Sequence, residues 1–261
     1  MPLLHVDAFA TQPFAGNPAG VCLPPAPREA AWMQAIAAEL GLPATAFVTS
    51  AGDGAWRLRW FSPTVELTLC GHGTLAAAHV LWETGRLARD ATARFATAAG
   101  TLAAVREDGW IAMDFPAEPA TETHAPVGLA EALGVKPRWI GRNRLDYVIE
   151  VDDETTLGAL APDLAALMAI ETRGVIVTAR ASSAGFDFVS RFFAPRMGLP
   201  EDAVTGSAHC CLGPLWGARL GRRELTGRQM SARGGVVRVV LAGERVGLAG
   251  HAVTVLRGEL L

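Results

Sequence analysis

Apolar and polar residues alternate along much of this chain, the pattern of strands that bury one face. The alternation is clear over Leu3–Phe9 and Trp56–Phe61, whereas helical spacing runs over Glu29–Leu40 and ends at Gly41. Further strands are expected at 19–23, 46–48, 91–96, 102–105, 110–115, 146–151, 174–178, 186–193, 229–232, 236–241 and 252–256, and further helices at 75–82, 128–134 and 160–169. Strands predominate, so the pattern predicts an α+β protein.

One pattern occurs twice. The segment Arg59-Trp60-Phe61-Ser62-Pro63 is echoed by Arg191-Phe192-Phe193-Ala194-Pro195. Aligning Trp82 on Trp216 sets Gly71-His72-Gly73 opposite Thr205-Gly206-Ser207, each followed by a helix-like apolar run. A repeat about half the chain long indicates two similar halves, since repeats of solenoid proteins have periods of roughly 20–50 residues.

These halves are expected to be residues 1–117 and 127–249. A segment rich in proline and small polar residues lies between them, at 118–126, and is expected to be a linker. We predict two pseudo-symmetric domains, each a strongly curved, mostly antiparallel sheet around a central helix.

Glycine-rich turns at the start of a helix suggest an anion-binding site in each half. The N–H groups of the first helical turn have no partner within the helix, and they lie at the positive end of the helix dipole. Candidates to bind a substrate anion are Gly71, Gly73, Thr205, Gly206 and Ser207. Nearby, Cys70 and His72 carry side chains that can move protons. If the halves face each other, the two turns would point into one cleft.

Composition excludes several classes of protein. The formal net charge is −3 with no basic stripe, so nucleic acid is not an expected partner. The N-terminus does not resemble a signal peptide, and no run of roughly 18 apolar residues predicts a membrane span. The four cysteines form no CxxC pair, which favours a reducing cytoplasm. Neither zinc-ligand spacing nor a dinucleotide-binding fingerprint is present.

Several segments together resemble the PhzF-like family of phenazine-biosynthesis isomerases, which is related to diaminopimelate epimerase and proline racemase. They are His5–Phe9, Gly16–Val21, Arg59–Pro63, Leu69–His72 and Glu201–His209. The resemblance implies the two-halved fold inferred above, a C-terminal tail (250–261) that returns to the first half, and homodimers. It also implies proton transfer on a small carboxylated substrate without cofactor or metal.

Two positions depart from the family pattern. Epimerases of this fold use one cysteine from each half; Cys70 stands at the first position, whereas the repeat alignment places Val204 at the second. PhzF-type isomerases use a glutamate as proton shuttle, in a stretch that corresponds to residues 42–48 here, and this chain has Ala44 at that position.

Each candidate residue has an ordinary structural alternative. His72 is an acid/base group or donor to a carboxylate, or else a capping or core residue. Cys70 is a base of lowered pKa or an inert buried thiol. Asp202, which would pair with His72, is a site carboxylate, an N-cap or a solvated residue of a turn. Asn17 lines the site or forms a turn.

Two functions follow from these alternatives. The first is an isomerase of small carboxylated molecules in which His72, Asp202 and Cys70 handle protons. The second is a non-catalytic protein that binds small anions in the same cleft after loss of the glutamate, as Ala44 suggests.

Overall fold

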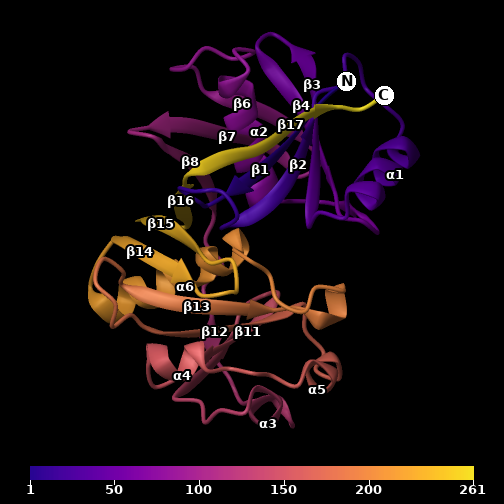
Figure 1. The fold of residues 1–261 in the computed structure, drawn as a ribbon. Coiled ribbons are helices and arrows are strands. Elements are labelled where there is room, and N and C mark those ends of the chain that lie inside the picture. Colours follow the sequence, from indigo (N-terminus) through magenta and orange to yellow (C-terminus); the bar gives the residue numbers. More distant parts are fainter. The chain divides into compact units, whose positions relative to one another are not determined.

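The chain forms two compact units. The structure is a computed structural model that describes all residues from 1 to 261. The first unit comprises residues 1–114 and 249–261, and the second comprises residues 115–248. Figure 1 shows that both consist mainly of strands. The α+β class expected from the sequence is confirmed.

In the first unit, nine strands surround α2 (Gly71–Glu83), and α1 (Ala30–Leu40) packs on the sheet's other side. The strands are β1 (Pro2–Ala8), β2 (Asn17–Cys22), β3 (Ala44–Gly52), β4 (Ala55–Phe61), β5 (Glu66–Leu67), β6 (Ala93–Thr97), β7 (Gly100–Glu107), β8 (Trp110–Pro116) and β17 (Ala252–Glu259). They are paired in the order β17-β1-β2-β3-β4-β6-β7-β8, with β5 also on β4. The C-terminal strand β17 therefore pairs with the N-terminal strand β1.

Helix α2 is the core of the first unit. Most of its residues are buried, from Gly73 through Trp82, as expected of a helix that is apolar on all sides. The run of alanines gives it high helix propensity and lets the strands approach closely. A smaller cluster, which includes Met33, Phe47 and Phe61, lies beneath α1. The two faces of β3 therefore bury different residues, one against each helix.

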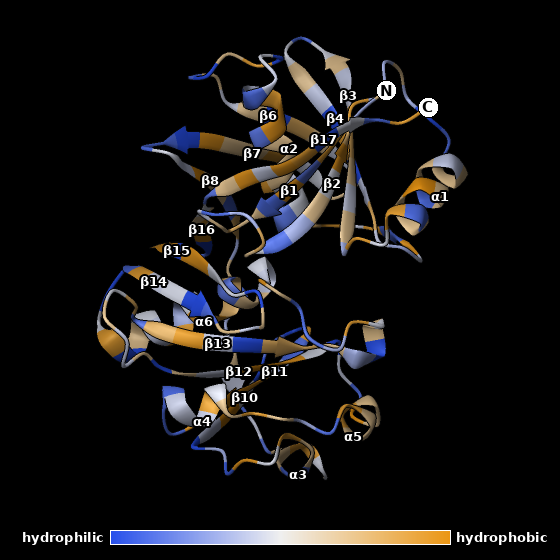
Figure 2. Ribbon diagram, in the orientation of Figure 1, coloured by the Kyte–Doolittle hydropathy of each residue, from blue (hydrophilic) through white to orange (hydrophobic).

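In the second unit, eight strands accompany α6 (Gly206–Leu220). The strands are β9 (Thr121–Glu122), β10 (Trp139–Arg142), β11 (Asp146–Glu150), β12 (Gly174–Arg180), β13 (Phe188–Phe193), β14 (Glu224–Gln229), β15 (Gly235–Ala242) and β16 (Arg245–Gly250). The shorter helices are α3 (Leu129–Leu133), α4 (Glu154–Gly158), α5 (Leu164–Met168) and the 3-10 turn η1 (Pro195–Met197). Figure 2 shows β13 mostly in the colour of hydrophobic residues, and its Val189 and Phe193 belong to the unit's core.

The two units share one topology. In the first, β2 and β3 are parallel, β4 returns antiparallel to β3, α2 follows, and β6 lies parallel to β4. In the second, the corresponding series is β11, β12, β13, α6 and β14, with the same directions. Each sheet curls around its helix without closing into a barrel. The repeat inferred from the sequence is thus a repeat of structure.

Some expected elements differ. The helix predicted at 160–169 begins only at Leu164, because Asp163 caps it by accepting a hydrogen bond from Ala166 N. The strand predicted at 229–232 lies instead at Glu224–Gln229; the chain leaves it in a turn where Gly234 N donates to Ser231 Oγ. Residues 118–126, expected as a linker, include β9, which pairs with β10.

Candidate functional site

The first glycine turn opens α2. Cys70 is the N-cap residue, in extended conformation, and its carbonyl accepts hydrogen bonds from Thr74 N and Thr74 Oγ1. Gly73 packs against the sheet: a Cβ there would lie 2.8 Å from Cδ1 of Trp60 and 3.0 Å from Sγ of Cys70. The close approach of helix and sheet requires glycine at this position.

A thiol and an imidazole meet at this turn. Sγ of Cys70 lies 3.5 Å from Nδ1 of His72, and His72 is half-buried whereas Cys70 is only 6% exposed. At this distance a hydrogen bond can join the two atoms. The sulfur accepts when Nδ1 carries the proton, and the thiol donates when Nδ1 is unprotonated. The pair also lies at the positive end of α2.

Ala44 and Asn17 lie on strands that pack against α2. Ala44 is the first residue of β3 and is fully buried. Its side chain shares a face with Ala46, which lies opposite Trp60 on β4. Asn17 is the first residue of β2 and is also fully buried, opposite Ala8. The position of the family glutamate therefore faces the side of the sheet that α2 covers.

The second glycine turn opens α6, with Thr205 as the N-cap. Asp202 is buried, and its Oδ2 accepts a 2.6 Å hydrogen bond from Thr205 Oγ1. Because Thr205 caps the helix, the alternative that Asp202 is its N-cap is wrong. The structure instead holds a buried carboxylate beside the turn.

Gln229 holds this turn in place. Its Oε1 accepts a 2.8 Å hydrogen bond from Thr205 N, and its Nε2 donates to the carbonyl of Asp202 at 2.8 Å. The side chain is fully buried at the end of β14. The sequence does not single out Gln229, because the residues around it, from 222 to 233, are mostly polar or charged.

Arg173 also reaches the second turn and was likewise missed. Its guanidinium pairs with the buried carboxylate of Asp146, and Nη2 donates a 3.0 Å hydrogen bond to Ser207 Oγ. Burial raises the pKa of Asp146, while the hydrogen bonds from Arg173 act against that rise. Since Ser207 accepts from arginine, its hydroxyl proton is left to point at another acceptor.

The two turns correspond through their caps. Cys70 and Thr205 are the N-caps, so Gly71 matches Gly206 and His72 matches Ser207. The alignment on the tryptophans, which set Val204 opposite Cys70, is one residue out of register at this point. Threonine therefore stands at the second cysteine position of the epimerases.

Each unit brings part of the predicted set together. The first holds Cys70, Gly71, His72 and Gly73 in one turn, with Asn17 on a strand beside the same helix. The second holds Asp202, Thr205, Gly206 and Ser207 around the start of α6. No group of three or more histidine, cysteine, aspartate or glutamate side chains has the arrangement of a metal site. None of the helices is both long and apolar enough to cross a membrane.

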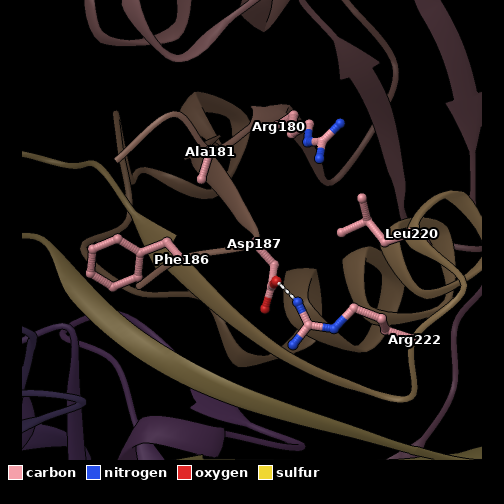
Figure 3. A pocket seen from close by; sticks show the side chains of 6 residues that line it. All are labelled: Arg180, Ala181, Phe186, Asp187, Leu220 and Arg222. Carbon is pink, nitrogen blue, oxygen red and sulfur yellow. Dashed lines mark hydrogen bonds and ion pairs between the residues drawn. The ribbon is translucent and has the colours of Figure 1, made fainter. Parts of the chain in front are cut away.

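The second unit also has a pocket whose lining includes no residue of that unit's glycine turn (Figure 3). It is lined by Arg180, Ala181, Phe186, Asp187, Leu220 and Arg222. Asp187 forms an ion pair with Arg222 and accepts a hydrogen bond from Thr226 N. The carboxylate and one of the two arginines thus satisfy each other.

Comparison with known proteins finds matches along nearly the whole chain. The profile of the PhzC-PhzF family, described as phenazine biosynthesis-like protein, matches residues 6–258. An uncharacterized isomerase of Halalkalibacterium halodurans is 48% identical over 261 residues, covering 100% of this chain and 98% of that protein.

Solved structures give the same result. The crystal structure of a phenazine biosynthesis protein of the PhzF family from Enterococcus faecalis matches with a TM-score of 0.95 and 38% identity, covering 100% of this chain and 98% of that chain. A probable proline racemase from Agrobacterium radiobacter shares the fold, with a TM-score of 0.66 and 13% identity over 100% of this chain and 92% of that one. The chain therefore belongs to the PhzC-PhzF family of phenazine biosynthesis-like proteins, as its sequence motifs predicted.

Proposed function

We propose that this protein is a PhzF-like isomerase that moves a proton between carbon atoms of a small carboxylated substrate, without a cofactor. One observation carries the proposal. The same helix-opening glycine turn occurs once in each unit, and each turn has a proton-transfer side chain beside it: His72 with Cys70 in the first unit, Asp202 in the second.

Substrate binding would use the backbone of both turns. A carboxylate at one turn accepts hydrogen bonds from the N–H groups that open the helix and is stabilised by the helix dipole. In the second unit the Ser207 hydroxyl adds a donor, because Arg173 occupies its acceptor side. Asn17 would add an amide contact from β2. The proposal requires both turns to face one cleft between the units.

Proton transfer would proceed through the side chains. One base removes a proton from the carbon next to an activating group, and the N–H groups of the second turn stabilise the oxygen on which negative charge develops. The proton then returns to a different carbon. His72, Asp202 and Cys70 are the candidates, since Ala44 has no group that could serve as the shuttle.

The alternative is a protein that binds small anions and catalyses nothing. Ala44 favours it, because the position of the family's proton shuttle is a methyl group buried against α2. The variant Ala44→Glu separates the two. If it gains isomerase activity that the wild type lacks, the chain retains a complete binding site and the non-catalytic alternative holds. If the wild type turns over substrate, another base is at work.

The test of the proposed function is hydrogen exchange with solvent. Small mono- and dicarboxylates, including substrates of PhzF-type isomerases and racemases, are incubated with the protein in deuterated water. Incorporation of deuterium at carbon is expected for at least one of them. Absence of exchange across the whole panel would count against isomerase chemistry.

We propose further that the protein works in the cytoplasm as a homodimer. All four cysteines are buried and none forms a disulfide, which suits a reducing compartment. Analytical ultracentrifugation of the purified chain tests the dimer, and a monomer at micromolar concentration would exclude it.

A further inference from the structure

Trp60 is a buried hydrogen-bond donor whose indole N–H makes no hydrogen bond in the structure. The residue is 1% exposed, and no protein atom accepts a hydrogen bond from its Nε1. The indole N–H groups of the tryptophans in α2 and α6, in contrast, have acceptors: Trp82 donates to Ala91 O, and Trp216 donates to Thr178 Oγ1. A buried donor without a partner costs about 1–3 kcal/mol.

The position of the indole suggests its acceptor. The point where a Cβ on Gly73 would sit is 3.3 Å from Nε1 of Trp60 and 3.0 Å from Sγ of Cys70. The N–H edge of the ring and the cysteine sulfur therefore border the same small volume beneath the first turn of α2. A neutral thiol is a weak acceptor, whereas a thiolate accepts hydrogen bonds strongly.

We propose that Trp60 is a positioning residue: its indole N–H, which makes no hydrogen bond in the structure, turns to the sulfur of Cys70 once that thiol has ionised, and so stabilises the thiolate. The proton leaves Sγ for the imidazole of His72, 3.5 Å away, and no other bond changes. The inference rests on the role of Cys70 in the proposed function and adds a residue to that role. It also gives Gly73 a second purpose, because any side chain there would separate the ring from the sulfur.

Other ionisable groups near α2 either have partners of their own or lie at the far end of the helix. Arg59 of β4 forms an ion pair with Glu66, and Asp7 of β1 accepts a hydrogen bond from Phe14 N and lies 3.8 Å from His5. At the other end of α2, away from the turn, are His79 and Glu83 of the helix itself, Arg257 of β17 and Arg106 of β7. His72 is thus the titratable side chain expected to exchange the proton of Cys70.

The pKa of Cys70 tests the inference without any substrate. Its alkylation by iodoacetamide is followed from pH 5 to 10 by peptide mass spectrometry, in the wild type, in Trp60→Phe and in Trp56→Phe. Trp56 is a matched control, because it lies on the same strand and face and its buried Nε1 also lacks an acceptor. Trp56 precedes Trp60 by four residues, which is about 13 Å along the strand.

We expect Trp60→Phe to raise the pKa of Cys70 by about one unit, because hydrogen bonds to charged groups are among the stronger ones. At a pH below the pKa, this shift lowers the fraction of thiolate about tenfold. Trp56→Phe is expected to leave it unchanged. An unchanged pKa in Trp60→Phe, or equal shifts in both variants, overturns the inference. Alkylation requires no turnover, so this result does not depend on whether the protein is an isomerase.

A measurement on the wild-type tryptophan covers the case in which Trp60→Phe does not fold. In protein with 15N-labelled indoles, the proton resonance of the Trp60 N–H is expected to move downfield as Cys70 ionises. Cys70→Ala is expected to abolish that movement. A Trp60 resonance that does not respond to the ionisation of Cys70 overturns the inference.

Discussion

Nη2 of Arg173 donates a 3.0 Å hydrogen bond to Oγ of Ser207, the second residue of α6. Behind it, the buried carboxylate of Asp146 fixes the guanidinium. The matching second residue of α2 is His72, which contacts Cys70 instead. The two turns thus share a backbone shape but differ in chemistry: one holds a fixed hydroxyl, the other a pair of groups able to exchange a proton.

The ion pair behind Ser207 predicts a large loss of stability on truncation. Arg173→Met leaves the carboxylate of Asp146 buried without its partner, and we expect the free energy of unfolding to fall by about 3 kcal/mol. Urea denaturation measures this loss. Arg180→Met is the control, because Arg180 is exposed at the far end of β12, the strand that begins directly after Arg173, and its effect should be within about 0.5 kcal/mol. Equal effects of the two substitutions would show that the buried pair contributes little.

Asp202→Asn is expected to abolish most of the activity while the fold is kept. Asparagine still accepts the hydrogen bond from Thr205 Oγ1 through its side-chain carbonyl, but it cannot take up a proton. The loss in kcat should be about 100-fold or more, the usual contribution of a general acid or base. Asp153→Asn, at the exposed cap of α4, should have no effect on kcat. Full activity of Asp202→Asn would remove this carboxylate from the proton path.

His209 makes stability depend on pH. Burial within α6 lowers its pKa to about 4, against the hydrogen bond that links Nδ1 to Thr205 O and acts to raise it. The unfolded chain, with a histidine pKa of about 6.5, therefore binds the proton first as the pH falls. The contribution of His209 to the free energy of unfolding is therefore complete above about pH 6.5, and about 3 kcal/mol of it is lost as the pH falls to 4.

Chemical denaturation at a series of pH values checks this dependence. In His209→Gln the decline between pH 6.5 and 4 should be reduced, because the group that titrates is gone. His124→Gln, which replaces an exposed histidine, should keep the wild-type slope. A slope that is the same in all three proteins would assign the acid sensitivity to other groups.

Gly73→Ala should destabilise the first unit. The added methyl group would meet Trp60 at 2.8 Å and Cys70 at 3.0 Å, and such overpacking costs roughly 1–3 kcal/mol. At Gly247 a Cβ would meet nothing closer than 3.6 Å, so Gly247→Ala is the control and should change stability little. Thermal unfolding compares the two. Equal melting temperatures would mean that the helix can move away from Trp60 at little cost.

The features that could be predicted from the sequence are the local ones. The Arg-aromatic-Phe pattern and the glycines mark the repeat directly, so the strands β4 and β13 and the helices α2 and α6 follow from it. Apolar alternation likewise locates most of the longer strands. These signals depend on residues close together in the chain.

The parts that could not be predicted depend on distant residues. Gln229 reaches Asp202 and Thr205 across 24 residues or more, and Arg173 reaches Ser207 across 34. Nothing near them in the sequence distinguishes these polar residues from surface ones. The one-residue error between the turns arose because Trp82 and Trp216 lie at different distances from their helix caps.

Incorporation of deuterium from solvent into a small carboxylate measures directly whether this protein transfers protons at carbon. The panel of small carboxylates is assayed with the wild type, His72→Gln, Asp202→Asn and Ala44→Glu, each checked for folding by circular dichroism. We expect deuterium at carbon in at least one of the carboxylates with the wild type, and a rate of incorporation about 100-fold or more lower with His72→Gln and with Asp202→Asn. No exchange in the wild type, together with exchange in Ala44→Glu, would rule out isomerase chemistry in the wild type and identify a binding protein that has lost its catalytic glutamate.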